Sequence, residues 1–214
     1  MKITNEISNN FELLAGSKNG EADLSILSGL FSINFGEGFL DDKVKKNVDE
    51  VVKRQLDVGI DVVSDGEMSK ISYATYIKDR IKGFSGESER RAPADLDAFP
   101  AYKTKIANSG GTPTYTRPCC TSELEIQDTQ SLKNDIKNLS DSLNSNSHSK
   151  AFMNAASPGV INVFMPNKFY KDDDTYLEKL SEVMSPEYKL ITDNNIHLQL
   201  DCPDLALARH MNYK

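Results

Sequence analysis

The sequence has no tryptophan, only three cysteines among 214 residues, and no long apolar run. Cys119, Cys120 and Cys202 are too few for a disulfide framework and lack the C-x-x-C spacing of a zinc site. Because Cys119 and Cys120 are adjacent, a strand would point them to opposite faces, and we expect inert, half-buried thiols. No stretch approaches the roughly 18 apolar residues of a membrane span, and residues 1–20 lack a signal-peptide pattern, so the expected location is cytoplasmic.

Positive charge is also scarce, since 25 basic residues face 32 acidic ones and the net charge is −7. An acidic chain is a poor match for nucleic acid or an anionic membrane surface, so neither is expected as a partner. An apolar content of 38% without a low-complexity tract indicates a globular protein. The length is enough for one sizeable core, and one domain is the default expectation.

The most informative stretch, 59–67, combines a run of β-branched apolar residues with the polar sequence Ser-Asp-Gly-Glu. The apolar run is typical of a short buried strand, and carboxylates at its end need partners or a ligand. In parallel βα folds, ligands bind at the carboxyl ends of strands, where Glu67 would lie. The spacing equally fits a helix start, with Ser64 or Asp65 as the N-cap and Glu67 in the first turn.

Four strands are expected, each followed by a helical pattern. They lie near residues 11–16, 60–65, 149–155 and 196–201. The segment 83–126, with its glycines, prolines and mixed charges, is interpreted as an inserted excursion with strand or hairpin structure over 112–126. Strands that alternate with helices indicate βα units and a parallel sheet.

Helical periodicity is clearest over 41–58, which begins with two aspartates and ends at Gly59. Its apolar face comprises Val44, Val48, Val51, Val52 and Leu56. Two more helices are expected from apolar spacing, one after Glu67 and one near 132–143. Their apolar residues are Tyr73, Tyr76, Ile77 and Ile81, and Leu132, Ile136, Leu139 and Leu143. A helix is expected over 172–184. A second helix should begin directly after it, with Ser185 as the N-cap of the second helix and Pro186 in its first turn.

Two acidic blocks resemble a known family. Residues 55–67, Q-L-D-V-G-I-D-V-V-S-D-G-E, resemble the Q-x-x-x-G-[IL]-D-V-x-x-x-G-E segment of the cobalamin-independent methionine synthase family. Residues 198–206, L-Q-L-D-C-P-D-L-A, resemble its Q-[IL]-D-x-P motif, in the form found in the methionine synthase II-like branch of the uroporphyrinogen decarboxylase/methionine synthase-like superfamily. Residues 156–160 and 166–167 match that branch too, and the resemblance extends over about 13–210.

The resemblance implies an α/β fold of the (β/α)8 TIM-barrel type. By the count of strands, residues 1–214 hold only the first half of a barrel, about four βα units, as one partial domain with 83–126 inserted after the second strand. An opened barrel has unpaired edges and an uncovered inner face, for which Val62, Leu198 and Leu200 are candidates. We therefore expect an oligomer or a complex with a complementary half-barrel.

The resemblance also implies three substrate-binding residues, Ser17, Glu67 and Asp201, which would hold a thiol amino acid such as homocysteine. Two carboxylates suit an ammonium group, because charge-assisted hydrogen bonds fix its orientation. Ala15-Gly16-Ser17 matches the [IV]-G-S end of the family's first strand, but Lys18-Asn19-Gly20 follows where that branch has an Arg-Pro. No residue of this chain is assigned as catalytic.

The implied reaction moves a methyl group from a methylated folate to a zinc-bound thiolate, without cobalamin. The family's zinc ligands, a His-x-Cys pair, a glutamate and a distant cysteine, follow the Q-x-D-x-P strand and do not occur in this sequence. His148, His197 and His210 do not reproduce them and are expected in an exposed turn, packed in a strand and on a helix surface, respectively. The chain is thus expected to bind the acceptor but to hold no zinc alone.

Other functions remain open. The chain could be a non-catalytic truncated protein or a split-barrel partner, and an adjacent coding sequence for the His-x-Cys strand would separate these readings. A different thiol could be the acceptor, since the same superfamily includes transferases that act on coenzyme M. Glu67 and Asp201 could instead be the acid/base pair of a barrel glycosidase, which the absence of tryptophan and of sugar-binding aromatic patterns disfavours.

Overall fold

The structure, a computed structural model, describes residues 39–88, 94–108 and 117–206, and those from Val44 onward belong to one compact unit. The expected strand near 11–16, Ser17 and His210 lie outside the described residues. The fold is mixed α/β, with helices α3 (Phe39–Asp57), η1 (Thr75–Asp79), η2 (Ala94–Ala98), α4 (Pro100–Asn108), α5 (Gln130–Ser145), α6 (Pro158–Phe164) and α7 (Asp173–Asp193), and strands β1 (Ile81–Ser88), β2 (Arg117–Ile126), β3 (Phe152–Ala156) and β4 (His197–Asp201).

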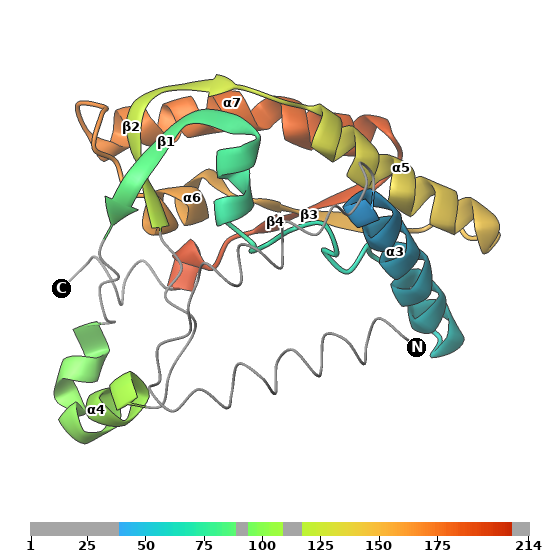
Figure 1. Cartoon of the computed structure of the whole chain (residues 1–214), viewed down its shortest axis with the longest axis horizontal. Coiled ribbons are helices and arrows are strands. Elements are labelled where there is room, and N and C mark those ends of the chain that lie inside the picture. Colours follow the sequence, from blue (N-terminus) through green and yellow to red (C-terminus); the bar gives the residue numbers. More distant parts are fainter. Residues whose placement is uncertain (1–38, 89–93, 109–116, 207–214) are drawn as a thin grey trace. The chain divides into compact units, whose positions relative to one another are not determined.

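Strands β3 and β4 are parallel, with Phe152 opposite His197 and Ala156 opposite Asp201 (Figure 1). On the other side of β3, Val63 forms a parallel bridge with Ala151. The Val63 N–H donates to the Lys150 carbonyl at 3.2 Å. The expected third and fourth strands thus form within three residues of their predicted bounds, while the second is reduced to a bridge. The described segments form two two-stranded sheets and no closed barrel.

One face of this small parallel sheet packs against helices. Met153 and Ala155 of β3 are fully buried in a core that also contains Val48, Val52, Leu132, Ile136, Leu139 and Ile191. Leu198, the register partner of Met153, packs against the same core. The prediction that Leu198 faces a barrel interior is therefore wrong, because paired residues of parallel strands share a face. Val62 and Leu200 are 38% and 42% exposed.

Helices α3 and α5 confirm the periodicity seen in the sequence. Val48 and Val52 of α3 are buried, and Gly59, with a φ of +86°, follows the end of this helix. The four predicted apolar residues of α5, Leu132, Ile136, Leu139 and Leu143, are all buried. A period of 3.6 residues is enough to find a helix whose apolar face is continuous.

Helix α7 contradicts the predicted break at Ser185. The Asp172 side chain caps this helix by accepting the Thr175 N–H at 2.8 Å, and the helix runs through Pro186 without ending. Proline inside a helix removes one hydrogen bond and crowds the preceding turn. Here the buried Val183 and Glu187 on either side anchor the helix to the core, so tertiary contacts outweigh that local cost.

No α-helix forms between Glu67 and β1, which contradicts a second prediction. Tyr76 and Ile77 lie in the short 3-10 helix η1, and Ile81 begins strand β1 opposite Ile126. The Arg80 carbonyl accepts the N–H groups of Gln127 and Asp128 at 2.8 and 3.2 Å. The backbone groups of Arg80 and Ile81 that a longer helix would use for its own hydrogen bonds are thus paired with β2 and the residues after it.

A short helix, α6, begins directly after β3. Ser157 is the N-cap of α6, and its Oγ accepts the Val160 N–H at 3.0 Å. Pro158 occupies the first turn, where its missing N–H costs nothing.

The expected excursion contains an antiparallel pair of strands, with η2 and α4 between them in the sequence. In it, β1 pairs with β2 from Ile81 opposite Ile126 to Ser88 opposite Arg117 (Figure 1). The register shifts between Lys82 and Phe84, on either side of Gly83. Gly83 has a φ of +107°, a conformation that side chains with a Cβ rarely adopt.

We expect Gly83→Ala to lower the free energy of unfolding by about 2–4 kcal/mol, through backbone strain and overpacking. An added Cβ would lie 2.7 Å from Leu124 Cδ2 and 2.8 Å from the Glu123 carbonyl oxygen. Gly86→Ala is the matched control, since Gly86 also has a positive φ (+67°) but nothing lies within 4 Å of its added Cβ. Urea denaturation measures both variants, and equal losses would contradict the packing argument.

Two of the three cysteines are more deeply buried than the sequence suggests. Cys119 and Cys120 are both 0% exposed, which corrects the expectation of half-buried thiols. Burial raises the pKa of the Cys120 thiol to about 11. Cys202, just after β4, is partly exposed.

In the native protein at pH 8, we expect iodoacetamide to modify Cys202 at least about 100-fold faster than Cys120, because only the accessible thiolate reacts. A thiol with a pKa near 11 is about 0.1% ionised at that pH. Peptide mass spectrometry after timed quenching gives the rate at each cysteine. Labelling of Cys120 as fast as that of Cys202 would contradict this burial.

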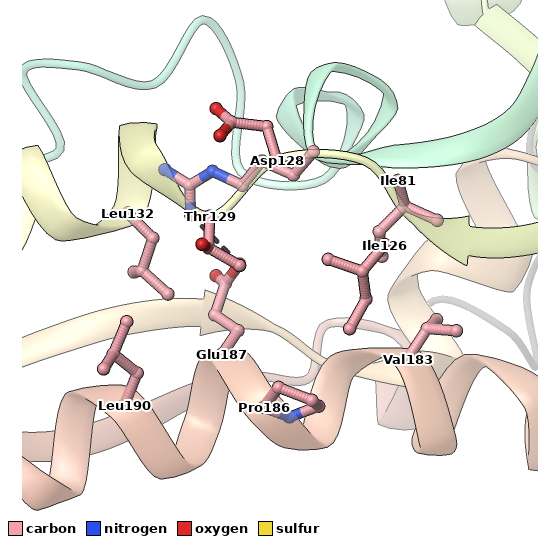
Figure 2. Close-up of a pocket in the computed structure, with 10 residues that line it drawn as sticks. Ile81, Ile126, Asp128, Thr129, Leu132, Val183, Pro186, Glu187 and Leu190 are labelled. Atoms are coloured by element: carbon pink, nitrogen blue, oxygen red, sulfur yellow. Dashed lines mark hydrogen bonds and ion pairs between the residues drawn. The ribbon is translucent and has the colours of Figure 1, made fainter.

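A buried ionic cluster joins η1 to α5 and α7. Arg80 donates to Glu187 at 3.0 Å and to Asp135 at 2.6 Å, and all three side chains are less than 10% exposed. Burial disfavours the Arg80 charge, but Glu187 and Asp135 outweigh it and raise the pKa of Arg80. Figure 2 shows Glu187 rising from α7 into a cavity of about 30 Å³ that Leu132, Leu190 and Ile126 help to enclose.

Tyr76 connects this cluster to the end of β3. Its hydroxyl donates to Glu187 at 2.8 Å and accepts the Ala156 N–H at 3.2 Å. Burial and the nearby Glu187 raise the pKa of Tyr76, so the hydroxyl remains a donor. The Arg80 guanidinium stacks 4.8 Å from the centre of the same ring.

Within the described ranges, no helix is both long and apolar enough to span a membrane.

Candidate functional site

The backbone before Glu67 is held by the side chain of Gln55. Its amide accepts the Ser64 N–H at 3.0 Å and donates to the Ser64 carbonyl at 2.9 Å, as a neighbouring strand would. Asp65 is buried, and its carboxylate accepts the Glu67 N–H at 3.0 Å. Gln55 and Asp65 of the 55–67 block thus fix the position of Glu67.

Glu67 itself has an unusual backbone. Its φ of +54° follows the +64° of Gly66, and positive φ costs an ordinary residue roughly 1–2 kcal/mol. Asp65 therefore stabilises a tight turn, and the capping hypothesis is wrong because residues 66–74 form no helix. Strained residues of this kind gather at functional sites, which makes Glu67 a candidate on geometry alone.

Asn154 of β3 joins the two predicted acidic residues. Its Nδ2 donates to Glu67 Oε1 at 3.0 Å and lies 3.3 and 3.4 Å from the two carboxylate oxygens of Asp201. All three side chains are partly buried. One neutral donor thus lies between two carboxylates at the carboxyl end of the parallel strands.

An open pocket of about 480 Å³ surrounds this group. Glu67, Asn154 and Asp201 line it together with Tyr73, Leu200, Cys202 and Pro203. The Lys70 ammonium donates to the backbone carbonyl of Asn154 and lies 5.0 Å from the centre of the Tyr76 ring. Burial raises the pKa of Glu67, Lys70 opposes that rise, and Asp201 and Asp65 add to it.

The second acidic block is fixed to the start of α6. The Asp201 carbonyl accepts the Ser157 N–H at 3.1 Å, and Ser157 Oγ donates to Asp204 Oδ1 at 2.9 Å. A Cβ on Gly159 would lie 2.1 Å from Asp204 Oδ2, so only glycine leaves room for that carboxylate. Residues 156–160 and 198–206 therefore pack on each other and fix the end of β4 beside the start of α6.

The structure brings Glu67 and Asp201 together, and Ser17 lies outside the described residues. Their roles as substrate-binding residues remain predictions. The sequence reasoning missed Asn154, Lys70 and Tyr73. A signal existed for Asn154, the polar residue within the otherwise apolar Phe152–Ala156 strand.

His148 and His197, the two histidines within the described residues, lie in different surroundings. His148 Nε2 lies 3.0 Å from the Asp61 carbonyl oxygen, while His197 is exposed and not packed as predicted. His197 is the first residue of β4, opposite Phe152, and its N–H donates to the Ala151 carbonyl at 3.0 Å while its side chain faces solvent. Within 39–88, 94–108 and 117–206, no group of three or more His, Cys, Asp or Glu residues could hold a metal ion. The described residues therefore do not fit a zinc centre.

No protein-family model matches the sequence, and no curated protein matches it either. Several solved structures are similar in fold to this chain. The fold is similar to part of a B12-independent methionine synthase. That enzyme is from Shewanella sp. W3-18-1 and was solved in complex with selenomethionine.

The similarity has a TM-score of 0.59 at 16% sequence identity and covers 79% of this chain. It covers 44% of the Shewanella enzyme, so this chain spans less than half the length of that protein. At this identity the likeness concerns the fold, and function needs an argument from the site itself.

Proposed function

We propose that this chain carries the acceptor-binding part of a methyltransferase of the cobalamin-independent methionine synthase type, with a thiol amino acid such as homocysteine as the acceptor. The observation that carries the proposal is the meeting of Glu67 and Asp201 in one pocket beyond parallel strands. The similarity in fold and the two acidic sequence blocks support the same family. The fold itself is proposed to be part of a TIM barrel.

The chemistry of the pocket suits a primary ammonium group. Such a group has three N–H donors and a positive charge, and two ionised carboxylates offer it strong, charge-assisted acceptors. Glu67 is near the acids Asp201 and Asp65, whereas one cation, Lys70, opposes them, and the Lys70 ammonium donates to the backbone carbonyl of Asn154. The pocket thus keeps an excess of negative charge for a cationic ligand.

Ser17 is proposed to hold the other end of the acceptor, and a methylated folate is the proposed methyl donor. In full-length members of the family, bound zinc would lower the pKa of the acceptor thiol and so supply a thiolate at neutral pH. Because the described residues offer no set of zinc ligands, the role proposed here is to bind and orient the amino-acid end.

A glycosidase is not favoured by the geometry. Paired carboxylates in glycosidases flank the bond that breaks, and the space between them must admit sugar and water. The Asn154 amide occupies the space between Glu67 and Asp201.

Isothermal titration calorimetry tests the proposal with two ligands that differ only in the amine. We expect L-homocysteine to bind the chain at least about tenfold more tightly than 4-sulfanylbutanoic acid, since a charged hydrogen bond contributes about 1.5–3 kcal/mol. Equal affinities, or tighter binding of 2-sulfanylethanesulfonate, would contradict an amino-acid acceptor and favour a different thiol.

We further propose that a complementary barrel segment, on this or another polypeptide, pairs with the open edges of the parallel sheet. Among the described strands, β4 has a neighbour on one side only. Unpaired edges recruit partners, so we expect residues 1–214 to form dimers or larger species. Light scattering that shows a monodisperse monomer with a cooperative melt at micromolar concentration would contradict this.

A further inference from the structure

The Asn154 carboxamide is placed in one orientation by its neighbours. Its Nδ2 lies within hydrogen-bond distance of Glu67 and of both carboxylate oxygens of Asp201. The opposite orientation would face the amide oxygen toward two carboxylates, and acceptors repel one another. The amide therefore serves as a shared donor to both acids.

We propose that Asn154 holds Glu67 and Asp201 together as an ionised pair, and that this makes the pocket selective for a primary ammonium group. The identity of the ligand rests on the function proposed above. The effect of Asn154 on the two acids does not, because it can be measured in the protein alone.

Two neighbouring carboxylates tend to share one proton, because ionising the second one places like charges side by side. A hydrogen bond donated to the charged form opposes this tendency. Glu67 is faced by Asp65, Asp201 and Lys70, and the Asn154 amide is one of the groups that favour its ionised form. Without that amide, the repulsion from Asp65 and Asp201 remains, while a donor that stabilises the ionised form of Glu67 is lost.

A neutral donor is suited to this task. A lysine between the acids would cancel their charge and exclude a second cation, whereas an amide leaves the charge intact. Lys70 does not fill that place. Its ammonium donates to the backbone carbonyl of Asn154 and lies near the Tyr76 ring. A primary ammonium can donate to both acids, while a quaternary ammonium has no N–H to donate.

The first experiment follows the carboxyl carbons of Glu67 and Asp201 by ¹³C NMR as the pH is changed, without ligand. We expect Asn154→Ala to shift the Glu67 titration upward by about one pH unit, or about tenfold in proton affinity. Asn154→Asp, which keeps the shape and adds a third acid, should shift it further. Asn194→Ala, which removes an amide bonded to the Leu190 carbonyl, is the control and should leave it unchanged.

The second experiment measures L-homocysteine affinity of wild type and Asn154→Ala from pH 5 to pH 8. We expect a loss of about tenfold at pH 5 that shrinks to within about threefold at pH 8, because protonation of Glu67 competes less with the ligand as the pH rises. A role in folding alone would lower the affinity by the same factor at every pH.

The outcomes separate the two proposals. An unchanged Glu67 titration in a folded Asn154→Ala variant overturns this inference, whether or not homocysteine binds. A loss of affinity that is constant with pH overturns the link to ammonium selectivity. A shifted titration in a protein that binds no amino-acid thiol would support the pairing of the acids and refute the proposed function.

Discussion

Replacing Arg80 with alanine is expected to lower the free energy of unfolding by about 3–5 kcal/mol, the usual cost of breaking a buried ion pair from one side. Arg80 satisfies Glu187 and Asp135 at once, and both carboxylates are less than 10% exposed. Removing the guanidinium leaves two buried acids without their cation. It also removes the cation that stacks on the Tyr76 ring.

Urea denaturation followed by circular dichroism measures this loss. Lys137→Ala is the matched control, because its ion pair with Asp141 joins side chains that are 68% and 39% exposed. Such exposed pairs contribute at most about 1 kcal/mol. Equal losses in the two variants would show that the Arg80 cluster does not anchor η1 to the helices.

The second large effect is expected at the pocket, where Glu67→Gln and Asp201→Asn should each weaken L-homocysteine binding by about 10- to 100-fold. Each change replaces a charged acceptor by a neutral amide, and hydrogen bonds to charged groups contribute about 1.5–3 kcal/mol. Glu178→Gln, an exposed site on α7, removes the same charge elsewhere and is the control. Calorimetry at pH 7.5 gives the affinities, and unchanged binding in both site variants would contradict the proposed contact.

The pH dependence of binding should follow Glu67. Burial raises its pKa in the folded protein, so ligand affinity should fall as the pH decreases through that raised value. The effect on stability has the opposite sign, because a raised folded-state pKa means that the protonated form is favoured on folding. The contribution of Glu67 to stability is present at low pH and is lost as the pH rises through its folded-state pKa. Glu67→Gln should remove both dependences.

The parts of the fold that the sequence predicts well are those in which local pattern and tertiary packing agree. Helices α3 and α5 have one continuous apolar face each, and β3 and β4 are short strands on either side of the helices α6 and α7 in the sequence. The placement of Glu67 and Asp201 followed from a general property of parallel strands, whose carboxyl ends meet at one edge.

The errors arise where a distant contact decides the outcome. Pro186 predicted a helix boundary, but the buried Val183 and Glu187 hold α7 together across it. Ile81 has helical spacing relative to Ile77, yet pairing with Ile126 draws it into a strand. The face on which Leu198 lies depends on its register with Met153, which no local pattern contains.

Asn154 shows the same limit within the site. Its position inside an apolar strand marks it as unusual, but its meaning depends on which neighbours it meets. Those neighbours, Glu67 and Asp201, are 87 and 47 residues away in the sequence. Only the order of the strands, with β3 between Val63 and β4, brings the amide between the two acids.

A crystal structure of the chain with L-homocysteine tests the central claim most directly. The account predicts that the ligand's ammonium nitrogen lies within hydrogen-bond distance of the Glu67 and Asp201 carboxylates, in the pocket lined by Tyr73 and Cys202. Homocysteine bound with its carboxylate toward these acids, or bound elsewhere on the chain, would contradict it.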